Sequence, residues 1–254
     1  MKAMDVLSAF EGGRASFGLT ELARHAGLPL TTTHRIVADL LVADVLRREP
    51  DGQLRLGRRL WKVAQNAGRE VRESARPHLA ELFRQTGRPA QLAIRDAGHS
   101  LLIDVVHGPA QAGSPSRPGT RMPLHACATG KVMLAFEEPW IRSGYLTGTL
   151  AAPTRATQVD SGALDDQLAV VRREGFALSV EEARVGTAAL AVPVVVGTGY
   201  AVAAVGLVAA APDARRLREH LPVLRHAAAA MAVDAVRWPH ARAVVAAFEA
   251  QPEV

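Results

Sequence analysis

The sequence predicts an α+β protein in two parts, and three features of its 254 residues support this prediction. The first 57 residues place apolar side chains at helical spacing and end in a hairpin pattern. Basic side chains, almost all arginine, are concentrated between residues 47 and 69. From residue 91 short apolar runs alternate with helical stretches, which predicts a mixed sheet with flanking helices on its faces. The expected parts are a first domain at 1–57, a linker helix at 58–73, a second domain at 74–241 and a C-terminal tail at 242–254.

The composition excludes several classes of protein. Apolar residues make up 48% and charged residues 22%, which is ordinary for a globular chain. The single cysteine, Cys127, excludes a disulfide scaffold and a cysteine-rich zinc site. Of the 30 basic side chains 27 are arginine, and the net charge of +5 favours polyanionic partners. Because the N-terminus lacks the apolar segment of a signal peptide, we expect a cytoplasmic protein.

Residues 4–10 carry apolar side chains at helical spacing and form the first expected helix. A second helix is expected from Thr20, as its N-cap, to Gly27, as its left-handed C-cap. Thr31 then opens a third helix. The small Ala23, four residues before Gly27, lets two helices approach, so the pair fits the helix-turn-helix pattern. The expected buried face of the third helix consists of Ile36, Val37, Leu40 and Leu41.

A hairpin is expected directly after the third helix. Residues 45–49 and 53–56 read as two short strands around the turn Pro50-Asp51-Gly52. A hairpin at this point is the wing of a winged helix-turn-helix, and its arginines would lie beside a DNA backbone. The alternative for such a basic run is a solvated surface without a partner. For Thr31 the alternative role is capping of the helix, and for His34 it is packing. The candidate DNA-binding residues are Thr31, Thr32, His34, Arg35, Arg47, Arg48 and Arg55.

The remaining chain alternates between helices and strands. The linker helix carries Trp61, which we expect to pack against a second copy of the chain. The apolar run at 190–210 is broken by Pro193 and by two glycines near residue 198, so it predicts two strands and no membrane span. Expected helices lie at 58–72, 74–85, 129–136, 164–174 and from Asp213, and expected strands lie at 91–94, 101–103, 176–179, 188–196 and 200–209.

Three stretches of the sequence carry a family likeness: Leu19 to Leu41, Pro118 to Lys131, and Gly175 to Pro193. In this order and spacing the chain resembles the IclR (isocitrate lyase regulator) family of bacterial transcriptional regulators. The resemblance implies a winged helix-turn-helix, a linker helix and a GAF-like effector domain. It also implies a homodimer or homotetramer that binds operator double-stranded DNA, expected as an inverted repeat, and located with the nucleoid when bound.

The same resemblance implies an effector site in the second domain. It places Ala128, Thr129, Ser179 and Ala189 around one cavity, with Thr129, Ser179 and the helix-start N–H groups as a polar end. We expect Met122 and Leu178 to add an apolar wall, and an uncharged cavity suits a small organic acid or an aromatic metabolite. The alternative is close packing of helix on sheet with no cavity. The chain departs from the family at Thr33, Ser179 and Ala189, where valine, an acidic residue and cysteine are frequent.

Other chemistry has less support in the sequence. His125 has no second ligand at metal-binding spacing, so we expect a structural hydrogen-bonding role for it. Residues 125–132 only faintly resemble a phosphate loop, because Val132 stands where a Ser or Thr would bind magnesium. We therefore expect a ligand-responsive regulator without catalytic residues, metal or cofactor. The alternative is a small-molecule-binding protein or enzyme with a vestigial DNA-binding module, against which the basic wing argues.

Overall fold

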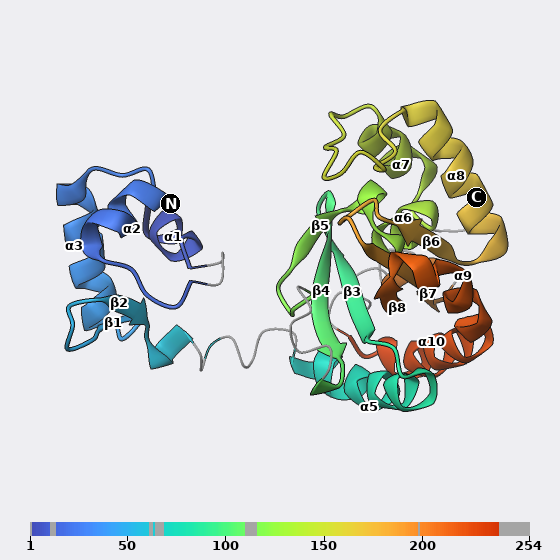
Figure 1. Cartoon of the computed structure of the whole chain (residues 1–254), viewed down its shortest axis with the longest axis horizontal. Helices are drawn as coiled ribbons and strands as arrows, with labels where there is room; N and C mark the ends of the chain where they lie inside the picture. The colour runs from blue at the N-terminus through green and yellow to red at the C-terminus, as the bar shows by residue number, and fades with distance from the viewer. Residues whose placement is uncertain are drawn as a thin grey trace, which may run out of the picture. The chain divides into compact units, whose positions relative to one another are not determined.

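The computed structural model describes residues 2–10, 14–60, 63, 69–109, 116–197 and 199–238. The chain divides into two compact units, residues 1–69 and 70–254 (Figure 1). No helix in these described ranges is long and apolar enough to cross a membrane. Trp61, the expected contact of the linker helix, and the expected tail at 242–254 lie outside the described residues.

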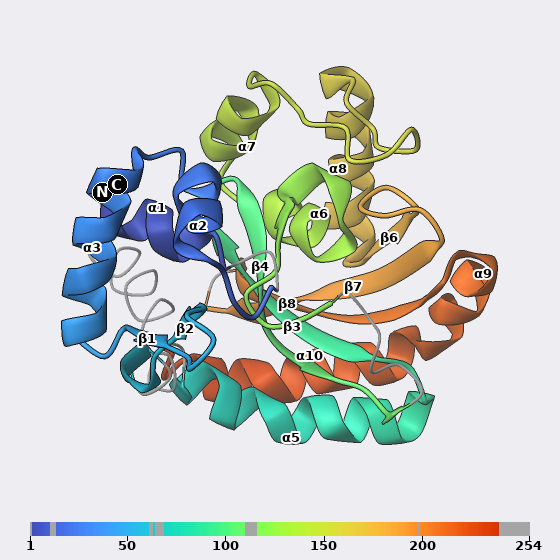
Figure 2. The ribbon, with the colours of Figure 1, turned by 60° about the vertical axis from the view of Figure 1, so that its left-hand side comes forward.

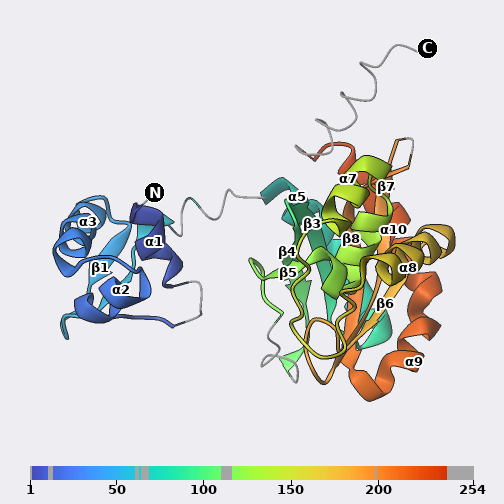
Figure 3. The same ribbon diagram turned by 90° about the horizontal axis from the view of Figure 1, so that it is seen from above.

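Up to residue 57 the described part of the first unit holds three helices and a two-stranded antiparallel hairpin (Figure 3), and residues 58–60 are helical as well. The helices gather around one apolar cluster, because each presents its apolar face to the others. The isolated bridge between Phe17 and Leu54 ties the segment before the second helix to the hairpin. The elements are α1 (Lys2–Ser8), α2 (Leu19–His25), α3 (Leu30–Val42), β1 (Leu46–Arg48) and β2 (Leu54–Leu56). The cluster consists of Val6, Phe10, Phe17, Leu22, Ile36, Val37, Leu46 and Leu54.

The helix-turn-helix is confirmed, but both expected N-caps are wrong. Helix α2 begins after Gly18, whose N–H donates to the Glu21 carboxylate at 3.2 Å, so Thr20 lies inside the helix. Helix α3 begins after Pro29, whose ring presets the backbone, so Thr31 lies within its first turn. Gly27 does adopt the left-handed conformation expected of it, with φ of 63°.

The second unit contains a six-stranded sheet in the order β5-β4-β3-β8-β7-β6. Every pairing between neighbouring strands of this sheet is antiparallel, so the expected mixed sheet is wrong, whereas the α+β class is confirmed. The hairpins β3–β4 and β7–β8 contribute to the alternating direction of neighbouring strands, because a strand that returns through a tight turn runs antiparallel to the one before it. The strands are β3 (Ala90–Asp96), β4 (His99–Val106), β5 (Arg121–Pro123), β6 (Ala177–Val180), β7 (Thr187–Val196) and β8 (Tyr200–Ala210).

Helices cover both faces of this sheet (Figure 2). On one face α5 (Arg69–Thr86) and α10 (Leu221–Ala235) pack with the sheet around Leu79, Val205 and Met231. The opposite face is covered by α6 (Ala128–Ala135) and α8 (Ser161–Glu174), with α7 (Pro139–Leu146) beside them. Each residue of a strand faces the layer opposite to its neighbour's, and this alternation decides which residues reach the site described below.

In the second unit, α5 and the final helical region also differ from the sequence prediction. Helix α5 runs unbroken through residues 72–74, where a break was expected, and Ser74 lies inside it. The Ser74 hydroxyl donates to the Val71 carbonyl oxygen of the preceding turn at 3.2 Å and accepts from Trp238 Nε1 at 2.8 Å, so it does not cap a new helix. The final helical region is also divided, with α9 (Ala214–Leu217) separated from α10 by a short 3₁₀ turn. Asp213 does not cap it through its side chain, which instead accepts a hydrogen bond from Arg88 at 2.9 Å.

Candidate functional site

The first candidate surface lies on α3 and the wing. In the first turns of α3 the side chains of Thr31, His34 and Arg35 are exposed, and Thr32 is half-buried. Thr33 is fully buried, and its hydroxyl donates to the Pro29 carbonyl oxygen at 3.1 Å. The inward turn of Thr33 therefore directs its neighbours on the helix toward solvent, where they are available to a partner.

The wing presents three expected arginines. Arg47 and Arg55 are directly opposite each other in the β1–β2 register, and both lie near the carboxylate of Glu49. Their side chains are 50% and 48% exposed, so these ion pairs are weak and can exchange for phosphate contacts. Arg48 donates to the Gly52 carbonyl oxygen at 3.1 Å and is exposed as well. Glu49 thus holds two basic side chains on one side of the hairpin.

Gly57 joins the wing to α3, a role that the sequence analysis did not identify. Its N–H donates to the Val45 carbonyl oxygen at 2.7 Å. A Cβ atom at this position would lie 2.2 Å from the carbonyl oxygen of Asp44. Only glycine permits this approach of two backbone segments, so the wing is fixed relative to the end of α3.

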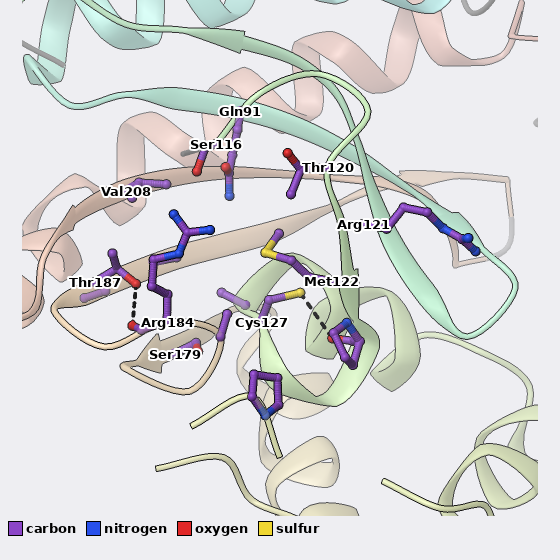
Figure 4. Close-up of a pocket in the computed structure, with 16 residues that line it drawn as sticks. Gln91, Ser116, Thr120, Arg121, Met122, Cys127, Ser179, Arg184, Thr187 and Val208 are labelled. Carbon is purple, nitrogen blue, oxygen red and sulfur yellow. Dashed lines mark hydrogen bonds between the residues drawn. The ribbon is translucent and has the colours of Figure 1, made fainter. Parts of the chain in front are cut away.

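The second candidate site is a cavity of about 250 Å³ in the second unit. It lies between β3, the segment before and along β5, the start of α6, and the β6–β7 loop (Figure 4). Its walls combine small apolar side chains with a few polar groups, as in ligand sites generally. It is lined by Gln91, Ser116, Thr120, Arg121, Met122, Pro123, Cys127, Ala128, Pro153, Ser179, Ala183, Arg184, Thr187, Ala188, Ala189 and Val208.

Four of the six expected effector residues line this cavity: Met122, Ala128, Ser179 and Ala189. Thr129 and Leu178 do not line it. Thr129 is 1% exposed, and its hydroxyl lies 2.8 Å from the hydroxyl of Ser100. Leu178 packs on the α5–α10 face of the sheet. Because Ser179 faces the opposite layer and donates to the Ala126 carbonyl oxygen at 3.4 Å, alternation turns Leu178 away.

The cavity also contains charge, which corrects the expectation of an uncharged site. Arg121 and Arg184 both line it, and Gln91, Ser116 and Thr120 add polar groups. Arg121 extends away from the cavity and pairs with Asp96 at 3.0 Å, whereas the guanidinium of Arg184 points into it (Figure 4). Sequence spacing could not identify these residues, because Gln91 and Arg184 are brought together only by the sheet order.

His125 is buried, and both of its ring nitrogens lie within hydrogen-bond distance of a partner. Its Nε2 lies 2.8 Å from the Ala151 carbonyl oxygen, which can only accept, so Nε2 carries the hydrogen. Nδ1 therefore accepts from the Tyr145 hydroxyl at 2.7 Å. Burial, with a smaller effect of nearby Lys131, lowers the pKa of His125 below its ordinary value. The neutral ring has a structural hydrogen-bonding role, as the sequence predicted.

Two further groups bear on catalysis and metal binding. Burial raises the pKa of the Cys127 thiol, which keeps it in the unreactive protonated form. Lys131 is an anchor, because its ammonium pairs with Glu182 at 2.6 Å and also donates to Gln167. Within the described part of the chain no group of three or more His, Cys, Asp or Glu side chains could hold a metal ion.

Comparison with family models matches both units. Residues 1–50 match the model described as the IclR helix-turn-helix domain. Residues 64–235 match the model described as the bacterial transcriptional regulator IclR C-terminal domain. Among curated relatives, the glycerol operon regulatory protein of Streptomyces griseus is 31% identical over 240 residues, covering 92% of this chain and 94% of that protein. The HTH-type transcriptional regulator XynR of Escherichia coli is 32% identical over 200 residues, covering 76% and 78%.

Solved structures agree with these matches. An IclR homolog from Microbacterium hydrocarbonoxydans, complexed with 4-hydroxybenzoate, has a TM-score of 0.82 at 27% identity, covering 92% of this chain and 97% of that one. The IclR of Thermotoga maritima has a TM-score of 0.76 at 24% identity, covering 91% and 96%, and supports the fold.

Proposed function

This chain belongs to the IclR family of bacterial transcriptional regulators, and we propose that it binds operator DNA through α3 and the β1–β2 wing under control of a metabolite in the C-terminal cavity. The observation that carries the DNA part is the exposure of Thr31, His34 and Arg35 on the second helix of the helix-turn-helix. In this motif the N-terminal residues of that helix contact base edges in the major groove.

The contacts divide into two kinds. Arg35 reads a base, because a guanidinium can donate to both acceptors of a guanine edge. Thr31, Thr32 and His34 contact phosphates or bases near the helix start. Arg47, Arg48 and Arg55 on the wing bind phosphates and therefore add affinity without sequence preference. The short Asp51–Gln53 turn keeps these arginines close together, since Asp51 accepts the Gln53 N–H at 2.9 Å.

The functional species is a homodimer or homotetramer that reads an inverted repeat. One winged helix contacts few base pairs, which gives too little discrimination in a genome. Two copies related by a twofold axis contact two half-sites and thereby increase specificity. A regulator that acts on operator DNA works in the cytoplasm, with the nucleoid.

The cavity is the effector site, and its ligand is a small organic acid or an aromatic metabolite. The similar structure from Microbacterium hydrocarbonoxydans, which holds 4-hydroxybenzoate, supports this class of ligand. The small side chains of Ala128, Ser179 and Ala189 leave room for it. Binding of the effector changes the DNA affinity only if the effector binds one arrangement of the oligomer more tightly than another. The protein is not an enzyme in this proposal, which the engaged His125 and the protonated Cys127 support.

The DNA part is tested by selecting bound sequences from random duplex DNA with the purified protein. We expect an inverted repeat, and a log affinity that falls linearly with log salt concentration. Light scattering on the same sample should show a dimer or a larger oligomer. Recovery of no preferred sequence, or a monomer with and without DNA, would contradict the proposal.

The cavity part is tested by filling the cavity. Thr129 is unsuitable for this purpose, because a larger side chain there would overpack the core against Ser100. Ala189→Phe instead adds a ring to the cavity wall. We expect operator binding near that of the wild type and no response to 4-hydroxybenzoate or related acids in a retardation assay. Ala151→Phe, at an exposed position that does not line the cavity, is the matched control and should respond as the wild type does.

A further inference from the structure

We infer that the cavity is a carboxylate site, in which the guanidinium of Arg184 and the side-chain amide of Gln91 together bind the carboxylate group of the ligand. This inference rests on the proposed function of the cavity as the effector site, and it names the groups that select the ligand. It also moves the polar end of the site away from Thr129 and Ser179, whose hydroxyls are already bonded within the protein.

Gln91 is the first group that points to a ligand. It lies on β3, is 3% exposed, and lines the cavity. Its amide oxygen has no hydrogen-bond partner among the described residues. A buried amide that is left without partners is destabilising, and such groups in native proteins usually have a functional reason. Figure 4 shows the amide end directed into the cavity, where its N–H groups can donate to a ligand carboxylate and its oxygen, which only accepts, can take a hydrogen bond from a ligand hydroxyl.

Arg184 is the second group, and its backbone is held firmly. The Arg184 carbonyl oxygen accepts from the Thr187 hydroxyl at 2.8 Å. Glu181 accepts the Gly186 N–H at 2.7 Å, and Glu182 is paired with the buried Lys131. These contacts fix the β6–β7 loop on both sides of Arg184. A fixed loop lowers the entropy lost when the side chain binds a ligand.

The side chain of Arg184 is unpaired in the part of the chain that the structure describes. It makes no ion pair with a described residue, and none of the described residues that line the cavity is acidic. The other cation of the lining, Arg121, is neutralised by Asp96. The exposed Arg184 therefore brings one positive charge that has no acidic partner in the described cavity lining, beside the side-chain amide of Gln91, and both point toward the same space (Figure 4).

This arrangement selects a monocarboxylate. An arginine fork donates two parallel hydrogen bonds to a planar carboxylate, and an amide N–H can donate a further one. A phosphate dianion would leave one charge uncompensated by a single free guanidinium. Met122, Ala188, Ala189 and Val208 supply apolar walls for the ligand body. The volume of about 250 Å³ lies below the usual range of about 300–1,000 Å³, so that body is small.

Calorimetric titration of the purified full-length chain tests the inference with defined probes. The probes are benzoate and butanoate, their neutral amides benzamide and butanamide, and phenyl phosphate. We expect at least one carboxylate to bind, and its amide and the phosphate to bind at least tenfold more weakly. Arg184→Met should weaken carboxylate binding about 10- to 100-fold, because charge-assisted hydrogen bonds are lost. Arg184→Lys should retain part of the affinity.

Two further variants separate recognition from folding. Gln91→Leu removes the amide at nearly constant volume and should weaken carboxylate binding while leaving the melting temperature unchanged or higher, because an unsatisfied buried group is gone. Arg121→Met removes the cation that is paired with Asp96 and should change carboxylate affinity less than threefold. Circular dichroism melting of every variant shows whether a loss of binding reflects unfolding.

The inference is overturned if neither carboxylate binds the wild type at 20 mM, if the amides bind equally well, or if folded Arg184→Met binds as the wild type does. Failure of the proposed function would appear differently. If Ala189→Phe abolishes a ligand response that Arg184→Met retains, the cavity is the effector site and only the carboxylate assignment fails. If no operator sequence is selected, the DNA-binding proposal fails while the titration still reports on the cavity.

Discussion

Lys131 in the first turn of α6 and Glu182 in the β6–β7 loop form a buried ion pair, with the ammonium 2.7 and 2.6 Å from the two carboxylate oxygens. Their side chains are 4% and 13% exposed. The pair links the helix at the base of the cavity to the loop that carries Arg184. Gln167 on α8 accepts a further hydrogen bond from Lys131 at 3.1 Å, so three segments meet at one ammonium group.

Lys131→Met should destabilise the C-terminal unit by about 3–5 kcal/mol, because it leaves the carboxylate of Glu182 buried without its partner. The double variant Lys131→Met/Glu182→Gln should regain part of this loss, since no buried charge then remains. Urea denaturation followed by circular dichroism measures both. Equal stabilities of the single and double variants would contradict the prediction.

The stability of the protein should fall at acidic pH through His125. Burial lowers the pKa of His125 from the ordinary 6.5, so below pH 6.5 the unfolded chain binds a proton here that the folded chain excludes. The contribution of the neutral His125 to the free energy of unfolding is complete above pH 6.5. It is lost as the pH decreases, by at most about 1.4 kcal/mol per pH unit. Urea midpoints between pH 7.5 and 5.5 should show a smaller decrease for His125→Asn than for the wild type. Parallel slopes for the two proteins would contradict this.

Gly130→Ala should destabilise the C-terminal unit by about 3 kcal/mol, because the added Cβ would lie 2.3 Å from the Leu124 carbonyl oxygen, closer than atoms can approach. Gly144→Ala on α7 is the matched control. Apart from its chain neighbours and the backbone of its own helix, no atom lies within 4 Å of its added Cβ, and alanine favours a helix interior, so this change should stabilise by about 1 kcal/mol. Thermal melting measures the stability of both variants. A Gly130→Ala protein as stable as the wild type would contradict the prediction and show that α6 can move away from the turn before it.

Arg35→Ala should weaken operator binding by about 1–3 kcal/mol and relax the preference at one base position. Arg55→Ala should weaken binding to all sequences alike and reduce the salt dependence, because a phosphate contact is lost. Repeating the selection from random DNA with each variant distinguishes the two effects. If Arg35→Ala leaves affinity and preference unchanged, α3 does not read the operator as proposed.

The sequence alone was sufficient where structure is decided locally. The helix-turn-helix depends on the left-handed Gly27, and the wing depends on the turn at Asp51 and Gly52, so short-range patterns predicted both. The alternation of strands and helices predicted the α+β class in the same way. Exposure of Arg35 follows from helical periodicity, because Ile36 and Val37 occupy the buried face.

Only the tertiary structure decided which distant residues share a site. Thr129 and Leu178 belong to the stretches that predicted the cavity, yet a hydrogen bond to Ser100 and the alternation of β6 turn them away. Gln91 and Arg184 lie 93 positions apart in the printed sequence and meet only because of the order of strands in the sheet. Strand pairing and buried hydrogen bonds join residues far apart in the chain, and no local pattern encodes such contacts.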